Sequence, residues 1–242
     1  MRGLLCVLLL AGCMRAKPEL PILNYHSVGA AADDYTVPVA AFEEQLDWLA
    51  SHGFHTVSLH DLAEWRQRRA PLPDKAIILT FDDGKADALG IVLPALRKRG
   101  MRATFFVITD LLGRAGYLTW DGVRALADAG MEIGSHTATH PRLSDLPDAR
   151  VQSELVESRL TLQGEPHRPV EALAYPYNSV RARIEKAARA AGYRVAVAGI
   201  EHGSADLLSL RRMPVNGMTR MEQFTAELAV FQRRGPTSRG HH

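Results

Sequence analysis

Residues 76–84 read Ala-Ile-Ile-Leu-Thr-Phe-Asp-Asp-Gly, an apolar run that leads directly into two carboxylates. Such a run, rich in Ile, Leu and Phe, is typical of a buried strand. Adjacent carboxylates at the end of a buried strand are costly to desolvate unless a cation or hydrogen bonds compensate. Asp82 and Asp83 therefore predict a metal-binding carboxylate beside a free base. The simpler alternative is a surface Asp-Asp-Gly turn.

Similar apolar runs recur along the chain and alternate with helical patterns. The alternation favours a parallel sheet covered by helices, and seven or eight such units favour a barrel, complete or incomplete, over an open sheet. No linker divides the chain, so we expect one α/β domain. The strand-like runs are 21–25, 54–57, 76–81, 103–108, 131–134, 170–175, 193–198 and 210–215. The helical patterns are 41–52, 59–69, 86–99, 120–129, 148–162, 181–191 and 221–233.

A second polar motif, Ser-His-Thr-Ala-Thr-His-Pro at 135–141, follows the strand-like run 131–134. Histidines four residues apart, such as His136 and His140, lie on one face of a helical turn and can bind one metal ion. That spacing alone is a weak signal. On a parallel barrel, however, residues beyond the carboxyl ends of strands converge, which brings both histidines toward Asp82 and Asp83. Two histidines and one carboxylate leave coordination positions open, as in catalytic metal sites.

Together, the motifs Thr-Phe-Asp-Asp-Gly and Ser-His-Thr-Ala-Thr-His resemble the polysaccharide deacetylase family, also called the NodB-homology domain or carbohydrate esterase family four. The resemblance covers roughly residues 20–224 and implies a distorted, incomplete (β/α) barrel. It implies that Asp83, His136 and His140 bind one divalent metal, with Zn²⁺ expected first and Co²⁺ or Ni²⁺ as alternatives. It also implies that Asp82 is the general base.

The segment Tyr-Pro-Tyr-Asn at 175–178 matches the family's third motif. The match implies that the backbone N–H of Tyr177 binds the oxyanion and makes Tyr175 a candidate orienting residue. The motif departs from the family pattern at Ala174, where an arginine is expected, and at Asn178, where glycine is usual. The late Asp/Trp and Leu-x-His motifs cannot be found, and His202 is the only late histidine in a comparable place.

These absences resemble the subgroup that deacetylates poly-β-1,6-N-acetylglucosamine, in which the motif order is permuted. There the acid histidine comes from the first strand, which implies His26 in Asn-Tyr-His-Ser at 24–27. A capping or packing role for His26 is the alternative. The segment 210–215 also resembles the subgroup, and Arg212 is a candidate to replace the missing arginine beside Asp82. A surface salt bridge is an equal alternative for Arg212.

The resemblance implies a hydrolase that removes N-acetyl groups from N-acetylglucosamine-containing polysaccharide and releases acetate. The metal would activate water and polarise the acetyl carbonyl, while Asp82 takes the water's proton and His26 protonates the leaving amine. O-acetyl xylan or peptidoglycan deacetylation would use the same ligands. A phosphohydrolase is disfavoured because its carboxylates would alternate rather than adjoin. A carbohydrate-binding lipoprotein with a decayed site is the non-enzymatic alternative.

The amino terminus predicts export. Residues 4–12 are apolar but too short to span a bilayer, and Leu-Ala-Gly-Cys at 10–13 resembles a lipobox. We therefore expect a signal peptide at 1–12, lipidation of Cys13, a tether at 13–19, a catalytic domain at 20–232 and a disordered tail at 233–242. The expected location is the bacterial cell envelope, at the outer membrane's periplasmic face or the cell surface. A plain secretory signal is the alternative.

The charge balance argues against a nucleic-acid partner. The net charge is +2 with neutral histidines, which is too small for a nucleic-acid-binding surface. After cleavage, the only remaining cysteine would carry the lipid, so neither a disulfide nor a thiolate metal site would be available. The expected partners are the polysaccharide and, through Cys13, a membrane; protein partners are left open.

Overall fold

The computed structural model describes residues 20–30, 33–67, 69–165 and 168–233. Cys13, the expected signal peptide and tether, and the tail beyond Arg233 lie outside the described residues. No helix within the described ranges is both long and apolar enough to cross a membrane.

Seven parallel strands form a closed ring. The ring closes because β1 pairs with β10 on one side and with β5 on the other. This confirms the (β/α) barrel of about seven strands, in its complete form. In ring order the strands are β1 (Ile22–Tyr25), β10 (Leu210–Pro214), β9 (Val195–Gly199), β8 (Ala172–Ala174), β7 (Glu132–Ser135), β6 (Thr104–Val107) and β5 (Ala76–Phe81). The short β4 (His55–Thr56) pairs with the start of β5 outside the ring.

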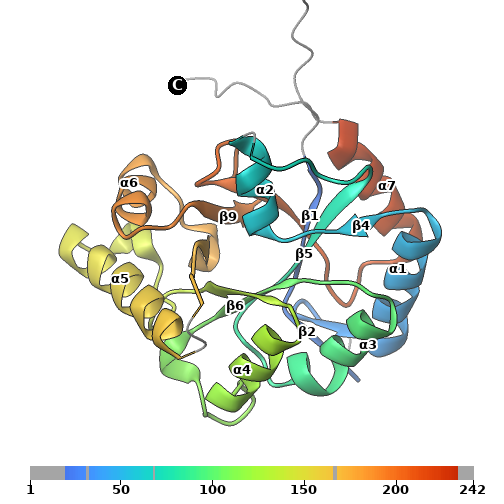
Figure 1. Cartoon of the computed structure of the whole chain (residues 1–242), viewed down its shortest axis with the longest axis horizontal. Helices are drawn as coiled ribbons and strands as arrows, with labels where there is room; N and C mark the ends of the chain where they lie inside the picture. Colours follow the sequence, from blue (N-terminus) through green and yellow to red (C-terminus); the bar gives the residue numbers. More distant parts are fainter. Residues whose placement is uncertain (1–19, 31–32, 68, 166–167, 234–242) are drawn as a thin grey trace, which may run out of the picture.

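Helices surround the ring (Figure 1), close to their expected positions. A small parallel pair, β2 (Ser27–Gly29) with β3 (Thr36–Pro38), was not expected from the sequence. The α-helices are α1 (Val39–Ser51), α2 (Leu59–Arg66), α3 (Leu93–Lys98), α4 (Trp120–Asp128), α5 (Asp148–Gly164), α6 (Ala182–Ala190) and α7 (Met221–Arg233). Single turns of other helix types are Ala88–Val92, Thr109–Leu111, Leu143–Asp145 and Pro176–Asn178.

The apolar core has two parts. The larger part lies between the strands and the outer helices, where residues such as Leu79, Phe105 and Leu155 are fully buried. The smaller part joins alternate strand residues, such as Ile78 and Phe106, to the apolar residues of α2. Because strand side chains alternate between faces, this second set fills the barrel interior, and α2 closes its amino-terminal end.

Helix α2 is fixed by polar contacts at its first turn. Ser58 and Asp61 form the capping box that the sequence predicts. The Glu132 carboxylate, at the start of β7, accepts hydrogen bonds from the backbone N–H groups of Leu59 (2.8 Å) and His60 (3.0 Å). It also accepts a hydrogen bond from the hydroxyl of Thr104. Burial raises the pKa of Glu132 despite these donors.

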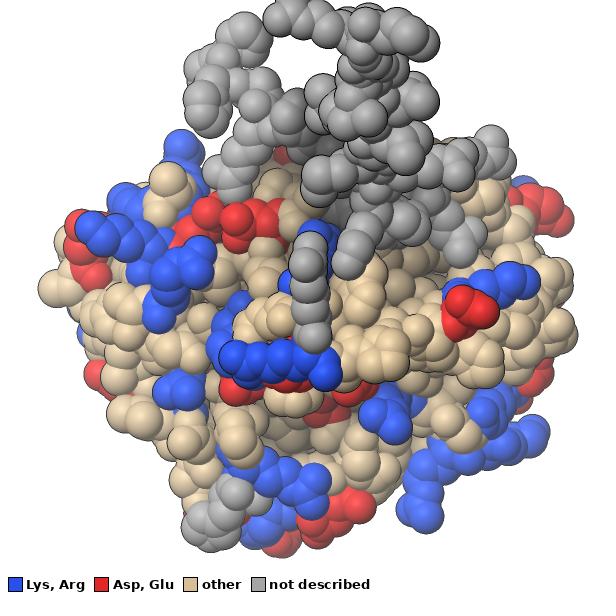
Figure 2. All heavy atoms as spheres, turned by 45° about the horizontal axis from the view of Figure 1, so that its top comes forward, with Lys and Arg blue, Asp and Glu red and all other residues tan. Residues whose placement is uncertain are grey.

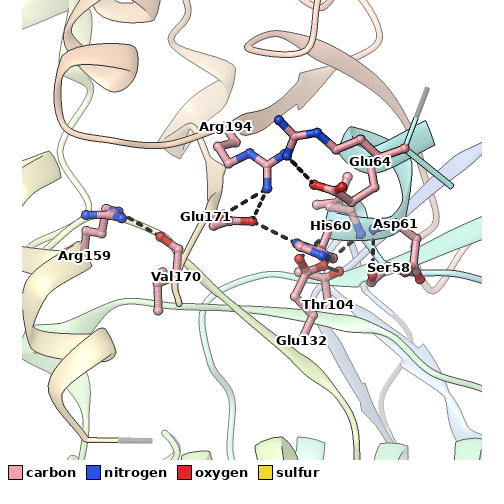
Figure 3. A network of polar contacts seen from close by, with 12 residues as sticks. Ser58, His60, Asp61, Glu64, Thr104, Glu132, Arg159, Val170, Glu171 and Arg194 are labelled. Atoms are coloured by element: carbon pink, nitrogen blue, oxygen red, sulfur yellow. Dashed lines mark hydrogen bonds and ion pairs between the residues drawn. The ribbon is translucent and has the colours of Figure 1, made fainter. Parts of the chain in front are cut away.

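The amino-terminal end of the barrel carries a wider polar network (Figure 3). The Arg194 guanidinium donates to Glu171 and to Glu64, and His60 contacts Glu171 at 2.8 Å. Elsewhere the surface carries mixed charge, and the face shown in Figure 2 has acidic and basic side chains interspersed. The network ties α2 to β8 and β9, and so supports the end of the barrel opposite the strand carboxyl termini.

We expect Glu132→Ala to lower the free energy of unfolding by roughly 3 kcal/mol, because three donors lose their buried acceptor. Urea titration followed by circular dichroism measures the change. Glu157→Ala, at an exposed glutamate on α5, is the control and should change stability by less than about 0.5 kcal/mol. Equal effects of the two substitutions would show that Glu132 does not fix α2.

Candidate active site

The polar residues singled out from the sequence meet at the carboxyl ends of the strands. They surround a pocket of about 390 Å³. Asp82 and Asp83 follow β5, His136 and His140 follow β7, and His26 follows β1. Parallel strands present their carboxyl ends on one face of a barrel, so segments far apart in sequence converge there. The pocket is lined by Asn24, His26, Tyr35, Asp82, Asp83, His136, His140, Tyr175, Tyr177 and Asn178.

Asp83, His136 and His140 form a compact candidate metal site. Asp83 Oδ1 lies 3.7 Å from the Nε2 atom of each histidine, and the two Nε2 atoms are 3.2 Å apart. This is the one cluster of its kind among the residues that the structure describes, with all ligand atoms within 4.8 Å. Two imidazole nitrogens and one carboxylate oxygen fit a divalent cation and leave a coordination position open.

The surroundings of both histidines favour metal binding. The Nδ1 atom of His136 lies 2.8 Å from the carbonyl oxygen of Ala174. A proton on Nδ1 donates to that carbonyl and leaves the Nε2 lone pair for a metal. Burial, together with the neighbouring His136, lowers the pKa of His140 to about 4. Its imidazole is therefore neutral near pH 7, as metal binding requires.

The loop that carries the two histidines is not the helical turn expected from their spacing. The chain leaves β7 at Ser135 and follows an irregular path, with φ of 67° at Thr137 and 62° at His140. Non-glycine residues seldom adopt this left-handed conformation, and it is sustained only where the surroundings enforce it. The pairing of the histidines therefore comes from loop shape, and the helical expectation was wrong.

Glu154 on α5 enforces that loop shape. Its buried carboxylate accepts the backbone N–H of Ala138 (3.0 Å) and of Thr139 (2.9 Å), and the Thr139 hydroxyl (2.7 Å). The sequence analysis missed this residue. A signal was present, because Glu154 lies on the same helical face as the buried Val151 and Leu155.

Asp82 is held by a buried arginine. Arg212 on β10 donates from Nη1 to Asp82 Oδ1 and from Nη2 to Oδ2, both at 2.7 Å, and from Nη1 to the Thr80 hydroxyl at 3.1 Å. Asp82 is 3% exposed and Arg212 1%. Burial is the largest influence and would raise the pKa of Asp82, but the charge and hydrogen bonds of Arg212, together with His136 and His26, outweigh it and the pKa is lowered. Arg212 is therefore not in a surface salt bridge.

His26 completes the polar side of the pocket. Its half-buried ring packs edge-on against Tyr35, with centroids 5.4 Å apart. Burial lowers the pKa of His26, and the carboxylates of Asp82 and Asp83 oppose that shift. Tyr35 was also missed, because it lies in the short segment between β2 and β3, where the sequence shows no strand pattern.

The two tyrosines of the third motif differ in their surroundings. Tyr177 has a left-handed backbone (φ 54°), and its ring lies 4.8 Å from both the His140 ring and the Arg142 guanidinium. The Tyr175 hydroxyl donates to the carbonyl oxygen of Leu208 at 2.8 Å, and the residue is 1% exposed. The Tyr175 hydroxyl is therefore bonded within the core, while the residue also contributes to the lining of the pocket.

We expect Glu154→Ala to weaken Zn²⁺ binding by about tenfold or more, because the loop carrying His136 and His140 loses its acceptor. Isothermal titration calorimetry on metal-stripped protein measures the affinity. Glu157→Ala lies on the same helix, three residues along, and should bind Zn²⁺ as the wild type does. Unchanged affinity in folded Glu154→Ala would show that the loop keeps its shape without this carboxylate.

Comparison with known proteins agrees with this geometry. The Bacillus subtilis protein YxkH, which carries the name of a polysaccharide deacetylase, is 32% identical over 182 residues; these cover 75% of this chain and 65% of YxkH. A poly-β-1,6-N-acetyl-D-glucosamine N-deacetylase of Escherichia coli is 30% identical over 134 residues, or 48% of this chain and 20% of that protein. The chain thus spans less than two thirds of either relative.

Among solved structures, Streptococcus pyogenes deacetylase PplD, in complex with acetate, superimposes with a TM-score of 0.79 at 25% identity, covering 86% of this chain and 98% of PplD. IcaB from Ammonifex degensii shares the fold, with a TM-score of 0.76 at 21% identity and coverage of 90% and 98%. The family profile described as "Polysaccharide deacetylase" matches residues 69–196. The chain belongs to the polysaccharide deacetylase family.

Proposed function

We propose that this protein hydrolyses the N-acetyl groups of an N-acetylglucosamine-containing polysaccharide, with the β-1,6-linked polymer as the first candidate, and releases acetate. The observation that carries the proposal is the placement of the Asp83, His136 and His140 cluster beside a carboxylate, Asp82, that Arg212 keeps ionised. The names of the E. coli relative and of similar Staphylococcus aureus proteins support the choice of polymer.

The three cluster residues would hold the metal, and we propose Zn²⁺ because imidazole and carboxylate ligands with an open position suit it. Bound there, the ion would polarise the acetyl carbonyl and make water more acidic. The protein's own contribution is geometric. It directs both Nε2 atoms and Asp83 Oδ1 to one point, next to the pocket in which the acetyl group would lie.

Asp82 acts as the general base. Both of its oxygens accept from Arg212, and each carboxylate oxygen has a second lone pair that can accept the proton of the attacking water. The lowered pKa keeps Asp82 ionised at neutral pH. The ion pair also fixes the side chain, so the base does not need to reorganise during the reaction.

Two further groups complete the reaction. The Tyr177 backbone N–H would stabilise the oxyanion as the amide carbon becomes tetrahedral. Protonated His26 would donate to the nitrogen of the leaving sugar amine, which is too basic to depart as an anion. His26 and Asp82 both line the pocket, so a base and an acid can act on one substrate.

We also propose that the protein is a lipoprotein of the bacterial cell envelope. The lipobox-like residues that end at Cys13 support this location. An envelope location matches the proposed substrate, since extracellular polysaccharide is accessible there. Metabolic labelling with a radiolabelled or clickable fatty acid would detect the lipid, and Cys13→Ser should abolish the labelling.

We expect Asp82→Asn to reduce acetate release from β-1,6-linked N-acetylglucosamine oligomers by about 10³-fold, because the amide cannot accept the proton. The assay measures acetate with added Zn²⁺, and calorimetry checks that Zn²⁺ still binds. Release from O-acetylated xylan or peptidoglycan, but not from the oligomers, would redirect the proposal to those substrates. Full activity of the variant would overturn the role of Asp82.

The pH dependence follows from two lowered pKa values. Asp82 stays ionised at all pH values above its ordinary pKa of 3.8. His26 must be protonated to donate, and burial lowers its pKa from 6.5, so kcat/KM should fall as pH rises through that lowered value. His26→Asn should remove this alkaline limb and reduce the rate by about 10²-fold. A limb that persists in the variant would assign the acid to another group.

A further inference from the structure

The two oxygens of the Asp83 carboxylate have different neighbours. Oδ1 lies 3.7 Å from the Nε2 atoms of both His136 and His140. Oδ2 lies 3.5 Å from the Nζ atom of Lys85, further along the same turn of the chain. A cation therefore stands beside the second oxygen of this candidate metal ligand.

The backbone places Lys85 beside Asp83. Residues 83 and 84 both have a left-handed φ, of 72° and 69°, so the chain turns at the end of the first motif. Lys85 then forms an antiparallel bridge with Tyr117, in the segment that leads into α4. Hydrogen bonds at 2.8 and 3.0 Å on either side of the bridge join residues 84–86 to residues 116–118. The base of the lysine side chain is therefore fixed by a neighbouring segment of the fold.

Tyr117 also holds the charged end of the side chain. Lys85 Nζ donates to the Tyr117 hydroxyl at 3.1 Å and lies 4.3 Å from the centre of the ring. Most exposed lysine ion pairs contribute little, because a long side chain loses conformational entropy when it is held in one geometry. Here the side chains of Lys85 and Asp83 are 27% and 19% exposed, and the phenol already restricts the lysine. The contact with Asp83 therefore needs little further ordering of Lys85.

A carboxylate can bind a metal ion through one oxygen or through both. Bound through one oxygen, Asp83 with His136 and His140 would leave positions for water and for the acetyl carbonyl. Bound through both oxygens, Asp83 would occupy one of those positions. The Lys85 ammonium opposes the second arrangement, because it attracts Oδ2 and repels a cation that approaches that oxygen.

The cations beside the two adjacent aspartates act differently. The Arg212 guanidinium is a planar fork and pairs with both oxygens of Asp82, which keeps the base in place. The Lys85 ammonium is a point charge and contacts Asp83 at Oδ2. Lys85 lies outside the lining of the catalytic pocket, so its effect on the reaction passes through Asp83.

We propose that Lys85 is a positioning residue that restricts Asp83 to binding the metal through Oδ1, and so keeps one coordination position open for the substrate. Tyr117 contributes by holding the lysine in place. This proposal rests on the proposed function and deepens it, because it assigns a role in the reaction to a residue outside the catalytic pocket.

The test is the number of Asp83 oxygens that bind Zn²⁺ in crystals of the metal-loaded protein. Lys85→Met keeps the length of the side chain and removes its charge, and Lys98→Met makes the same change at an exposed position of α3. We expect a single Asp83 oxygen within about 2.2 Å of the metal in the wild type and in Lys98→Met, and both oxygens bound in Lys85→Met. Lys85→Arg restores the charge and should restore binding through a single oxygen.

Solution measurements follow the same change. The visible absorption of Co²⁺-loaded protein weakens as the number of ligands rises, so Lys85→Met should absorb less than the wild type. With saturating Zn²⁺, its acetate release should fall about tenfold, and Lys85→Arg should recover most of that loss. Lys98→Met should match the wild type in both measurements.

A second variant keeps the proposal testable should Lys85→Met fail to fold. Tyr117→Phe keeps the ring and removes only the hydroxyl that holds Nζ. It should weaken the Co²⁺ absorption and reduce acetate release by about fivefold, as expected for the loss of one hydrogen bond. In folded Lys85→Met, adding Tyr117→Phe should cause no further loss, because the tyrosine acts through the lysine. A further loss in that background would overturn the role of Tyr117.

Metal coordination separates this proposal from the proposed function. Should the wild type release no acetate from any acetylated polymer, the proposed function fails, and the crystals and Co²⁺ spectra still decide the role of Lys85. Binding through both Asp83 oxygens in the wild type, or through a single oxygen in folded Lys85→Met, overturns the proposal and leaves the proposed function intact. A wild type that binds no divalent metal would overturn both.

Discussion

The ion pair between Asp82 and Arg212 is the constraint on which the rest of the site depends. Removing two charges from water is expensive, and only good geometry with further hydrogen bonds offsets the cost. Here both carboxylate oxygens are paired at 2.7 Å and Thr80 accepts from the same guanidinium. The partners come from β5 and β10, which β1 separates in the ring. Barrel closure through β1 therefore sets their spacing, and β1 itself leads into His26.

The candidate metal site depends on a different kind of constraint. Its two histidines lie on an irregular loop with two left-handed residues, a conformation that local sequence disfavours. Glu154 and the Ala174 carbonyl hold that loop from α5 and β8. Pre-formed geometry of this sort lowers the reorganisation needed when a metal binds. A helical turn would present the same spacing with no need for Glu154, so the cost of the strained loop is met by contacts from outside it.

Much of the fold could be predicted because local patterns and tertiary structure agree. The run 76–81 is strand β5 at the same bounds, and 221–233 is helix α7. The polar residues at strand ends also met as expected, because a parallel barrel dictates it. Contacts across the chain were harder to predict. Glu154 and Tyr35 act through packing of elements distant in sequence, and the Tyr175 hydroxyl found a core carbonyl instead of the pocket. These contacts depend on the directions of individual side chains, which the periodicity of the sequence does not encode.

The position of Arg212 on β10 accounts for one departure from the family pattern, the alanine at residue 174. The resemblance places an arginine at residue 174, on β8, whereas this chain has alanine there and pairs Asp82 with Arg212 on β10. Strand β8 borders β7, which leads into His136, whereas β10 borders β1, which leads into His26. The arginine on β10 therefore reaches Asp82 from the side of β1, and its Nε atom stays buried without a hydrogen-bond partner among the described residues. Moving one charge between strands thus preserves a buried partner for the Asp82 carboxylate and changes the side of the ring from which that carboxylate is held.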